Sequence, residues 1–75
     1  MPEALLQRVR ETIATCFGLD PAAIGEHTVQ ADIEAWDSVG HLNLMLLLED
    51  EFGVTLEVAD IERLTSVRAL VEFLD

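Results

Sequence analysis

The chain has 75 residues, of which 51% are hydrophobic, and its 15 acidic and 4 basic residues give a net charge of −11. A chain of this length forms one small domain, expected to span residues 1–75, and leaves no room for a deep catalytic cleft. Its negative charge excludes nucleic acid and disfavours an anionic membrane surface, because both would repel it. The charge predicts partners with basic surfaces, unless it serves only to keep a small protein in solution.

Nothing in the sequence indicates secretion or a membrane span. The start Met1-Pro2-Glu3 lacks the charged and apolar segments of a signal peptide, and no apolar run approaches the roughly 20 residues that cross a bilayer. The single cysteine, Cys16, cannot form an internal disulfide and is expected to be a small buried hydrophobic residue. We therefore expect a cytoplasmic protein. No metal site is expected, because no set of side chains has ligand spacing.

The first helix is predicted from Pro2 or Glu3 to Cys16 or Phe17. Proline suits the first helical position, and glutamate suits the positive end of the helix dipole. Gly18 predicts the end, because glycine readily adopts the left-handed conformation that stops a helix. Apolar residues at helical spacing are expected to face the core. They are Leu5, Leu6, Val9, Ile13, Cys16 and Phe17.

A long connection over residues 19–36 follows. Asp20 is expected to cap a short helical turn that begins at Pro21. The connection also holds apolar residues, which we expect to fold back over the helices and cap the core. They are Leu19, Ile24, Val29, Ile33 and Trp36. A connection of this length is often functional.

The second helix is predicted to start at Asp37 and Ser38 and to end at Phe52, before a left-handed Gly53. At 100° per residue it has two apolar faces. The face expected in the core consists of Leu44, Met45, Leu48 and Phe52. The face on roughly the opposite side consists of Val39, Leu42 and Leu46. Because so short a chain cannot bury a helix completely, we expect this second face to be at least partly exposed beside Ser38.

The remaining segments predict a short helix and a longer one. Residues 54–56 should form an extended link, and residues 58–64 a minor helix with Val58, Ile61 and Leu64 facing inward. Thr65 or Ser66 should cap a last helix through residue 74. Its inner stripe is Val67, Leu70, Val71 and Leu74. The prediction is an all-α fold without strand pairing. It is a small four-helix bundle of three main helices and one short helix, with a long loop between helices one and two.

Asp37, Ser38 and His41 have the residue types of a catalytic triad, but we reject that interpretation. All three lie within one helical turn, and no second segment supplies an oxyanion hole. His41 is expected to be packed or bonded to a loop. By residue chemistry alone Ser38 has two interpretations. It is either a helix-start serine of no special role, or an exposed hydroxyl where the dipole favours an attached phosphate.

The motif Asp37-Ser38-Val39, followed by Leu42, Leu46 and residues 49–53, resembles the acyl and peptidyl carrier proteins. The resemblance covers nearly the whole chain and implies an acyl-carrier-like helical bundle. It implies that the protein is not an enzyme. Instead, Ser38 would carry 4′-phosphopantetheine, with Asp37 beside it as a cofactor-binding residue. The thiol of the group would hold an acyl or aminoacyl group as a thioester.

The resemblance also implies partners and a surface that meets them. The partners are a phosphopantetheinyl transferase, an acyl- or aminoacyl-activating ligase, and a downstream synthase, transferase or thioesterase. Val39, Leu42 and Leu46 would form the docking patch, and Glu49 and Asp50 would meet basic enzyme surfaces. We expect a monomer. Tethering raises the local concentration of the cargo at a docked enzyme.

Four positions depart from the pattern of fatty-acid carriers, one of them mildly, since Val39 stands in place of the usual leucine after the serine. Gly40 and Asn43 stand where those carriers usually place acids on the exposed side of the helix, and Trp36 replaces a small residue before Asp-Ser. These departures favour a carrier of a polyketide, nonribosomal-peptide or related pathway, and because the chain starts at Met1 and ends just after the last predicted helix, we expect a free-standing carrier. A fatty-acid synthesis carrier is the alternative. The alternative of another class is a non-catalytic adaptor bundle with unmodified Ser38.

Overall fold

The computed structural model describes residues 2–75, so Met1, the first residue of the start that lacks signal-peptide features, lies outside the described residues. The α-helices are α1 (Glu3–Phe17), α2 (Ser38–Phe52), α3 (Val58–Arg63) and α4 (Val67–Leu74). Two 3-10 turns, η1 (Pro21–Ala23) and η2 (Gln30–Asp32), lie in the long connection. The all-α bundle of three main helices and one short helix is therefore confirmed. No helix in this part of the chain is long and apolar enough to cross a membrane.

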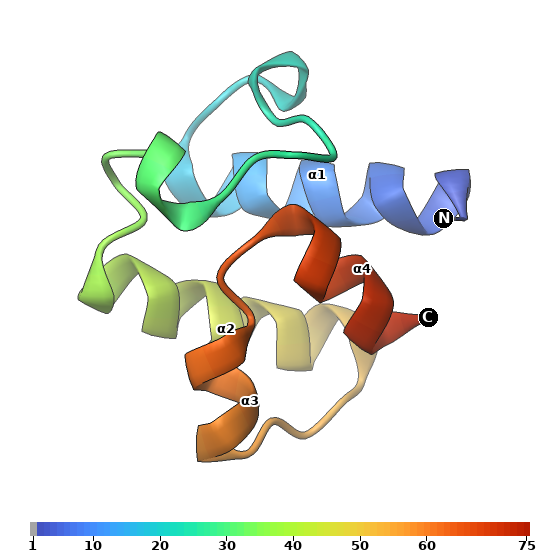
Figure 1. Ribbon diagram of the computed structural model, residues 1–75, viewed down its shortest axis with the longest axis vertical. Coiled ribbons are helices and arrows are strands. Elements are labelled where there is room, and N and C mark those ends of the chain that lie inside the picture. The colour runs from blue at the N-terminus through green and yellow to red at the C-terminus, as the bar shows by residue number, and fades with distance from the viewer. Residues whose placement is uncertain (1) are drawn as a thin grey trace.

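Helices α1 and α2 lie side by side and run in opposite directions, and α4 packs on α1 (Figure 1). The core between them is formed by side chains from α1, α2, α4 and the long connection. Its fully buried members include Val9, Ile13, Ile24, Trp36, Leu44, Leu48, Val67, Leu70 and Val71. The inner stripes predicted for the three main helices are thus those that pack in or against the core, although some members are only partly buried: Leu5, Leu6, Cys16, Phe17, Phe52 and Leu74.

The helix ends follow local chemistry that the sequence predicts. Gly18 and Gly53 adopt φ angles of 68° and 64° and stop α1 and α2 in the left-handed conformation. Asp20 accepts a hydrogen bond from the backbone N–H of Ala22 at 2.9 Å and so caps η1. Ser66, one of the two candidate caps, accepts from the N–H of Ala69 at 3.0 Å and begins α4.

The long connection covers the core with only part of its apolar residues. Ile24 and Trp36 are buried and Ile33 is half-buried, but Leu19 and Val29 are about 40% exposed, so their predicted burial is wrong. Arg10 holds the connection in place, because its guanidinium donates to the carbonyls of Ile24 and Pro21. These main-chain bonds fix the path of the loop without burying every apolar side chain.

One antiparallel bridge corrects the prediction of no strand pairing. Val29 and Ser66 form an isolated bridge, with the Gln30 N–H donating to the Thr65 carbonyl at 2.9 Å. The N–H of Val67 donates to the carbonyl of Thr28 at 3.0 Å on the other side. The bridge satisfies backbone groups at the start of α4 that have no partner within the helix.

Helix α3 ends at Arg63 rather than residue 64, and its first residue does not face the core. Val58 is 73% exposed, so its inward placement is wrong, whereas Ile61 is half-buried and Leu64 is buried. At 3.6 residues per turn Val58 lies about 120° from Leu64, and so short a helix can turn only one side inward.

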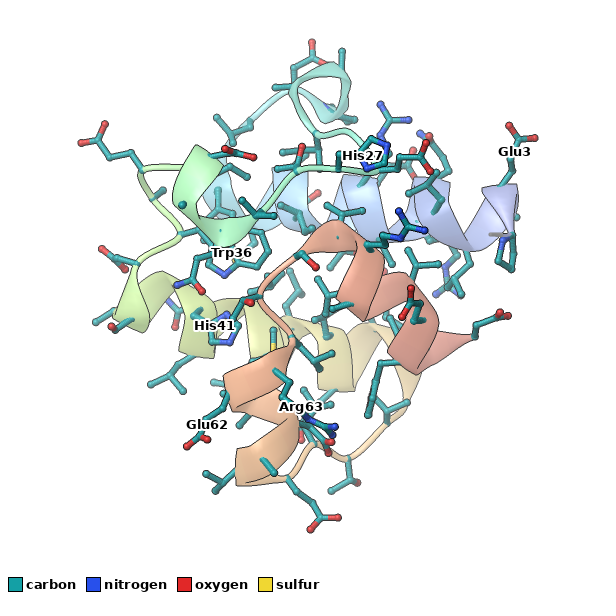
Figure 2. All side chains as sticks on the ribbon, in the orientation of Figure 1. Glu3, His27, Trp36, His41, Glu62 and Arg63 are labelled. Atoms are coloured by element: carbon teal, nitrogen blue, oxygen red, sulfur yellow. The ribbon has the colours of Figure 1, made fainter. Side chains whose placement is uncertain are left out.

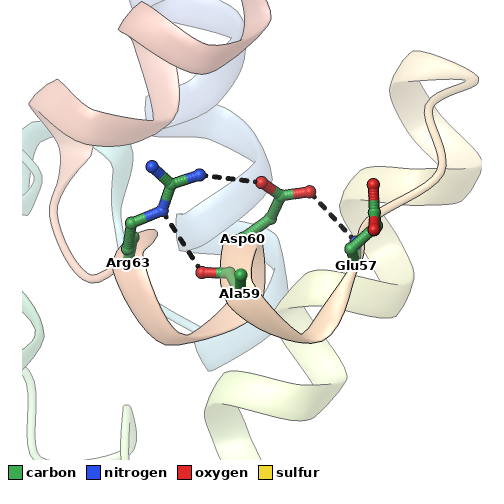
Figure 3. Close-up of polar contacts among 4 residues, drawn as sticks. All are labelled: Glu57, Ala59, Asp60 and Arg63. Carbon is green, nitrogen blue, oxygen red and sulfur yellow. Dashed lines mark hydrogen bonds and ion pairs between the residues drawn. The ribbon is translucent and has the colours of Figure 1, made fainter.

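Polar side chains support α3 from within (Figure 3). The Asp60 carboxylate accepts from the Glu57 N–H at 3.0 Å and from the Arg63 guanidinium at 3.0 Å. The Arg63 Nε also donates to the carbonyl of Ala59 at 3.3 Å. These bonds hold the helix together but do not attach it to the rest of the bundle.

Candidate functional site

The start of α2 is fixed by Asp37. Its carboxylate Oδ1 accepts a hydrogen bond from the Gly40 N–H at 2.8 Å, and its carbonyl accepts from the His41 N–H at 2.7 Å. Side chain and backbone of one residue therefore hold the first turn of the helix, as the N-cap prediction requires. Ser38 is the first helical residue, and its side chain is exposed at the positive end of the helix dipole.

Gly40 allows the preceding loop to pack against this first turn. A Cβ at position 40 would clash with the carbonyl oxygen of Ala35 and would lie 3.0 Å from a ring carbon of Phe17. The sequence pattern places Gly40 and Asn43 on the exposed side of the helix. In the structure Asn43 is exposed, but Gly40 is half-buried against the turn at residue 35, so its placement on that surface is wrong.

Trp36 and His41 flank the start of α2 from inside the molecule (Figure 2). The indole Nε1–H of Trp36 donates to His41 Nδ1 at 2.8 Å, and His41 Nε2 lies 2.6 Å from the carbonyl oxygen of Ile61. Because indole is only a donor, Nδ1 must accept, and the proton on Nε2 is then donated to Ile61. Both imidazole nitrogens are occupied, which supports the expectation of a packed histidine and the rejection of a catalytic triad.

The second apolar face of α2 is exposed as predicted. Val39 is 69% exposed, Leu42 54% and Leu46 65%. The two acidic residues predicted beside this face differ in their surroundings. Asp50 is exposed, whereas Glu49 is half-buried and accepts a hydrogen bond from the Leu56 N–H at 2.8 Å. Glu49 therefore also holds the link between α2 and α3. The surface formed by Val39, Leu42 and Leu46 is called the apolar face below.

A shallow groove open to solvent begins at Ser38 and follows the seam between α2 and α3. Residues from four separate segments line it. They are Gln30, Ser38, His41, Leu42, Ile61, Glu62 and Thr65. The sequence patterns identify Ser38 and Leu42 as site residues but miss the others, because η2, α3 and the start of α4 meet α2 only in the folded chain.

This arrangement suits a phosphate-linked group attached through the Ser38 hydroxyl. The hydroxyl is exposed at the N-terminal end of a long helix, where the dipole stabilises negative charge. The groove offers space for an attached arm, and the apolar face offers a surface for a partner. Within residues 2–75 no cluster of histidine, cysteine or acidic side chains is placed to hold a metal ion.

Comparison with known proteins identifies the family. A family model described as a phosphopantetheine attachment site matches residues 7–74, nearly the whole chain. The chain belongs to the phosphopantetheine-binding carrier family. It is similar to an acyl carrier protein from Thermotoga maritima, with 27% identity over 73 residues that cover 97% of this chain and 90% of the relative.

Membership of this family establishes several properties at a general level. The chain is a carrier protein of the acyl carrier type, and such carriers are not enzymes. Their prosthetic group is 4′-phosphopantetheine, and they interact with phosphopantetheinyl transferases and with acyl-handling enzymes. The exposed hydroxyl, groove and apolar face fit a protein of this kind.

We predict that Gly40→Ala destabilises the fold. Alanine favours a helix over glycine by about 1 kcal/mol, but its methyl group would clash with the Ala35 carbonyl. Overpacking of this kind typically costs about 1–3 kcal/mol, so we expect a net loss of unfolding free energy in urea titration. Gly25→Ala is the matched control, because its added Cβ would have its nearest contact, Thr28 Oγ1, at 3.7 Å. Equal stability of the two variants would contradict the close approach.

We also predict that Asp37→Ala loses the helix cap. Removal of an N-cap side chain costs about 0.5–2 kcal/mol, whereas asparagine caps almost as well as aspartate. Thermal unfolding should therefore show a lower midpoint for Asp37→Ala and a near-normal one for Asp37→Asn. If Asp37→Asn is as unstable as Asp37→Ala, the carboxylate stabilises the helix by its charge rather than as the cap described above.

Proposed function

We propose that Ser38 is the attachment residue for 4′-phosphopantetheine and that the chain delivers an acyl or aminoacyl group to partner enzymes. The observation that carries this proposal is the exposed hydroxyl of Ser38 on the first, capped turn of α2. When bound, the group supplies the thiol on which cargo is held as a thioester. The rest of the task belongs to the chain, acting as a single carrier domain.

The chain contributes a fixed attachment point for the arm, at the positive end of the α2 dipole. Asp37 holds the first turn through the N–H of Gly40, so the Ser38 oxygen has a constant position relative to the bundle. The positive end of α2 stabilises the charge of a phosphodiester there. Asp37 thus supports the attachment site by holding the backbone, with its carboxylate already bonded to Gly40.

The apolar face is the proposed docking surface. Exposed Val39, Leu42 and Leu46 lie on the helix that bears Ser38, and exposed Asp50 can meet a basic group at the rim. Glu49 adds negative charge while it holds the Leu56 N–H. Electrostatic attraction would speed the approach of basic partners, and apolar contacts would hold them. The proposed partners are a phosphopantetheinyl transferase, an activating ligase and a downstream synthase, transferase or thioesterase.

A specialised pathway, such as polyketide or nonribosomal-peptide synthesis, remains our proposal for the context of this carrier. Exposed Asn43 and buried Trp36 support it, since they depart from fatty-acid carriers. The lack of an acidic residue at position 40 does not support it, because close packing against the Ala35 carbonyl accounts for the glycine there. The fatty-acid carrier is the second candidate, because the chain shares the fold and the Asp-Ser motif of carriers in general.

We expect Ser38→Ala to abolish attachment. Incubation with coenzyme A and a broad-specificity phosphopantetheinyl transferase should add one phosphopantetheine to the intact protein, as measured by mass spectrometry. The chain has one other serine, Ser66, which caps α4. Ser66→Ala is therefore the matched control and should retain the mass gain despite lower stability. An unchanged mass of the unaltered protein would favour the adaptor alternative.

The internal cysteine should not obscure a thiol assay of the loaded arm. Cys16 is half-buried, less than the sequence predicts, and burial raises the pKa of its thiol. A raised pKa leaves less reactive thiolate at a given pH. Iodoacetamide at neutral pH should therefore alkylate the arm before Cys16.

We predict that Leu42→Glu and Leu46→Glu slow transferase modification without unfolding the bundle. Both side chains are more than half exposed, so their replacement removes partner contacts rather than core packing. Circular dichroism should be unchanged, and the rate of mass gain should fall at least several-fold. Thr15→Glu adds the same charge at an exposed position of α1 and is the control. Loss of helicity in either leucine variant would place that residue in the core instead.

A further inference from the structure

Helix α3 is attached to the bundle by few contacts. None of its six residues is buried, and the bonds of Asp60 and Arg63 lie within the helix itself (Figure 3). Its attachment relies on half-buried Ile61, on buried Leu64 just beyond its end, and on the bond from His41 to the Ile61 carbonyl. That bond crosses the seam between α2 and α3 beside Ser38.

The bond is one of two linked hydrogen bonds, which we call the relay. Both bonds can form at the same time only while the seam between α2 and α3 is closed. Trp36 donates to His41, and His41 donates to Ile61. Trp36 and His41 are 2% and 8% exposed, so neither group can readily turn to water. An alkyl chain that entered the seam would separate His41 from Ile61 and could offer no hydrogen bond in return. Entry of such a chain is therefore opposed.

The core of the bundle is already occupied by side chains. Leu44, Leu48 and Leu64 are at most 4% exposed in the core. The groove at the surface beside Ser38 and His41, by contrast, is open and partly polar, with Gln30, Glu62 and Thr65 on its walls. In Figure 2 Trp36 and His41 lie together at the start of α2, while Glu62 projects outward from α3. Cargo held in this outer groove would leave α3 in its place.

We propose that the Trp36–His41–Ile61 relay latches α3 to α2 and keeps cargo in the outer groove, so that this carrier serves short acyl or aminoacyl groups rather than long alkyl chains buried in the bundle. This inference rests on attachment at Ser38. His41 acts as a positioning residue. It holds α3 in place, and its ring hydrogen bonds go to Trp36 and Ile61 rather than to the Ser38 hydroxyl.

The test compares acetyl and octanoyl forms of the holo-protein, loaded from the corresponding acyl-coenzyme A by a broad-specificity transferase. A chain that inserts into the folded core stabilises it and raises the melting midpoint. The only tryptophan, Trp36, also reports insertion through its fluorescence. We expect the acetyl and octanoyl forms of the unaltered protein to have the same midpoint and the same Trp36 emission. A higher midpoint with altered emission in the octanoyl form would overturn the inference.

Variants of His41 test whether the relay is the cause. His41→Ala removes the latch, so its octanoyl form should melt above its acetyl form. His41→Gln keeps one acceptor and one donor and should behave as the unaltered protein. His27→Ala, which changes an exposed histidine, is the matched control. Equal midpoints for the two forms of His41→Ala would remove the relay as the cause.

Two further observations keep the outcomes distinct. If His41→Ala does not fold, Trp36→Phe removes the indole donor while it keeps an aromatic ring in the core, and the same comparison of midpoints applies to it. Failure of the unaltered protein to gain phosphopantetheine contradicts attachment at Ser38, whereas octanoyl insertion into the loaded protein contradicts only the latch.

Discussion

The packing of the turn at residues 35–37 against the first turn of α2 is the constraint on which the rest of the structure depends. Asp37 holds the Gly40 N–H, and the missing side chain of Gly40 lets the Ala35 carbonyl approach the helix. With the loop fixed in this way, Trp36 points into the core and Ser38 points out of it. One short segment thus fixes the core, the exposed hydroxyl and the direction of α2.

Helix α2 separates folding from recognition by its faces. Leu44 and Leu48 pack in the core, while Leu42 and Leu46 remain exposed at a cost that a protein without partners would not need to bear. The seam with α3 is different again, because a buried hydrogen bond from His41 closes it. The proposed docking role accounts for the exposed face, and the proposed latch accounts for the position of α3, none of whose residues is fully buried.

Local signals predict most of this fold from sequence. Asp37, Gly18 and Gly53 act on their own neighbours, so the helix ends are predictable, and helical periodicity separates the two faces of α2. Val58 and Val29 were misplaced because their burial depends on how a short helix and a loop lie on the bundle, which periodicity does not contain. The Trp36–His41–Ile61 relay and the contact of Gly40 with Ala35 likewise depend on backbone positions that only the folded chain shows.

In this structure the proposed attachment residue, Ser38, stands on a rigid helical turn and not on a flexible loop. Backbone ¹⁵N relaxation of the holo-protein measures this directly at residues 38–41. The structure predicts order parameters of about 0.85 there, equal to those of the core helices, because cap and packing hold the first turn. Values below about 0.6 at these residues would show a mobile attachment segment and would contradict the account.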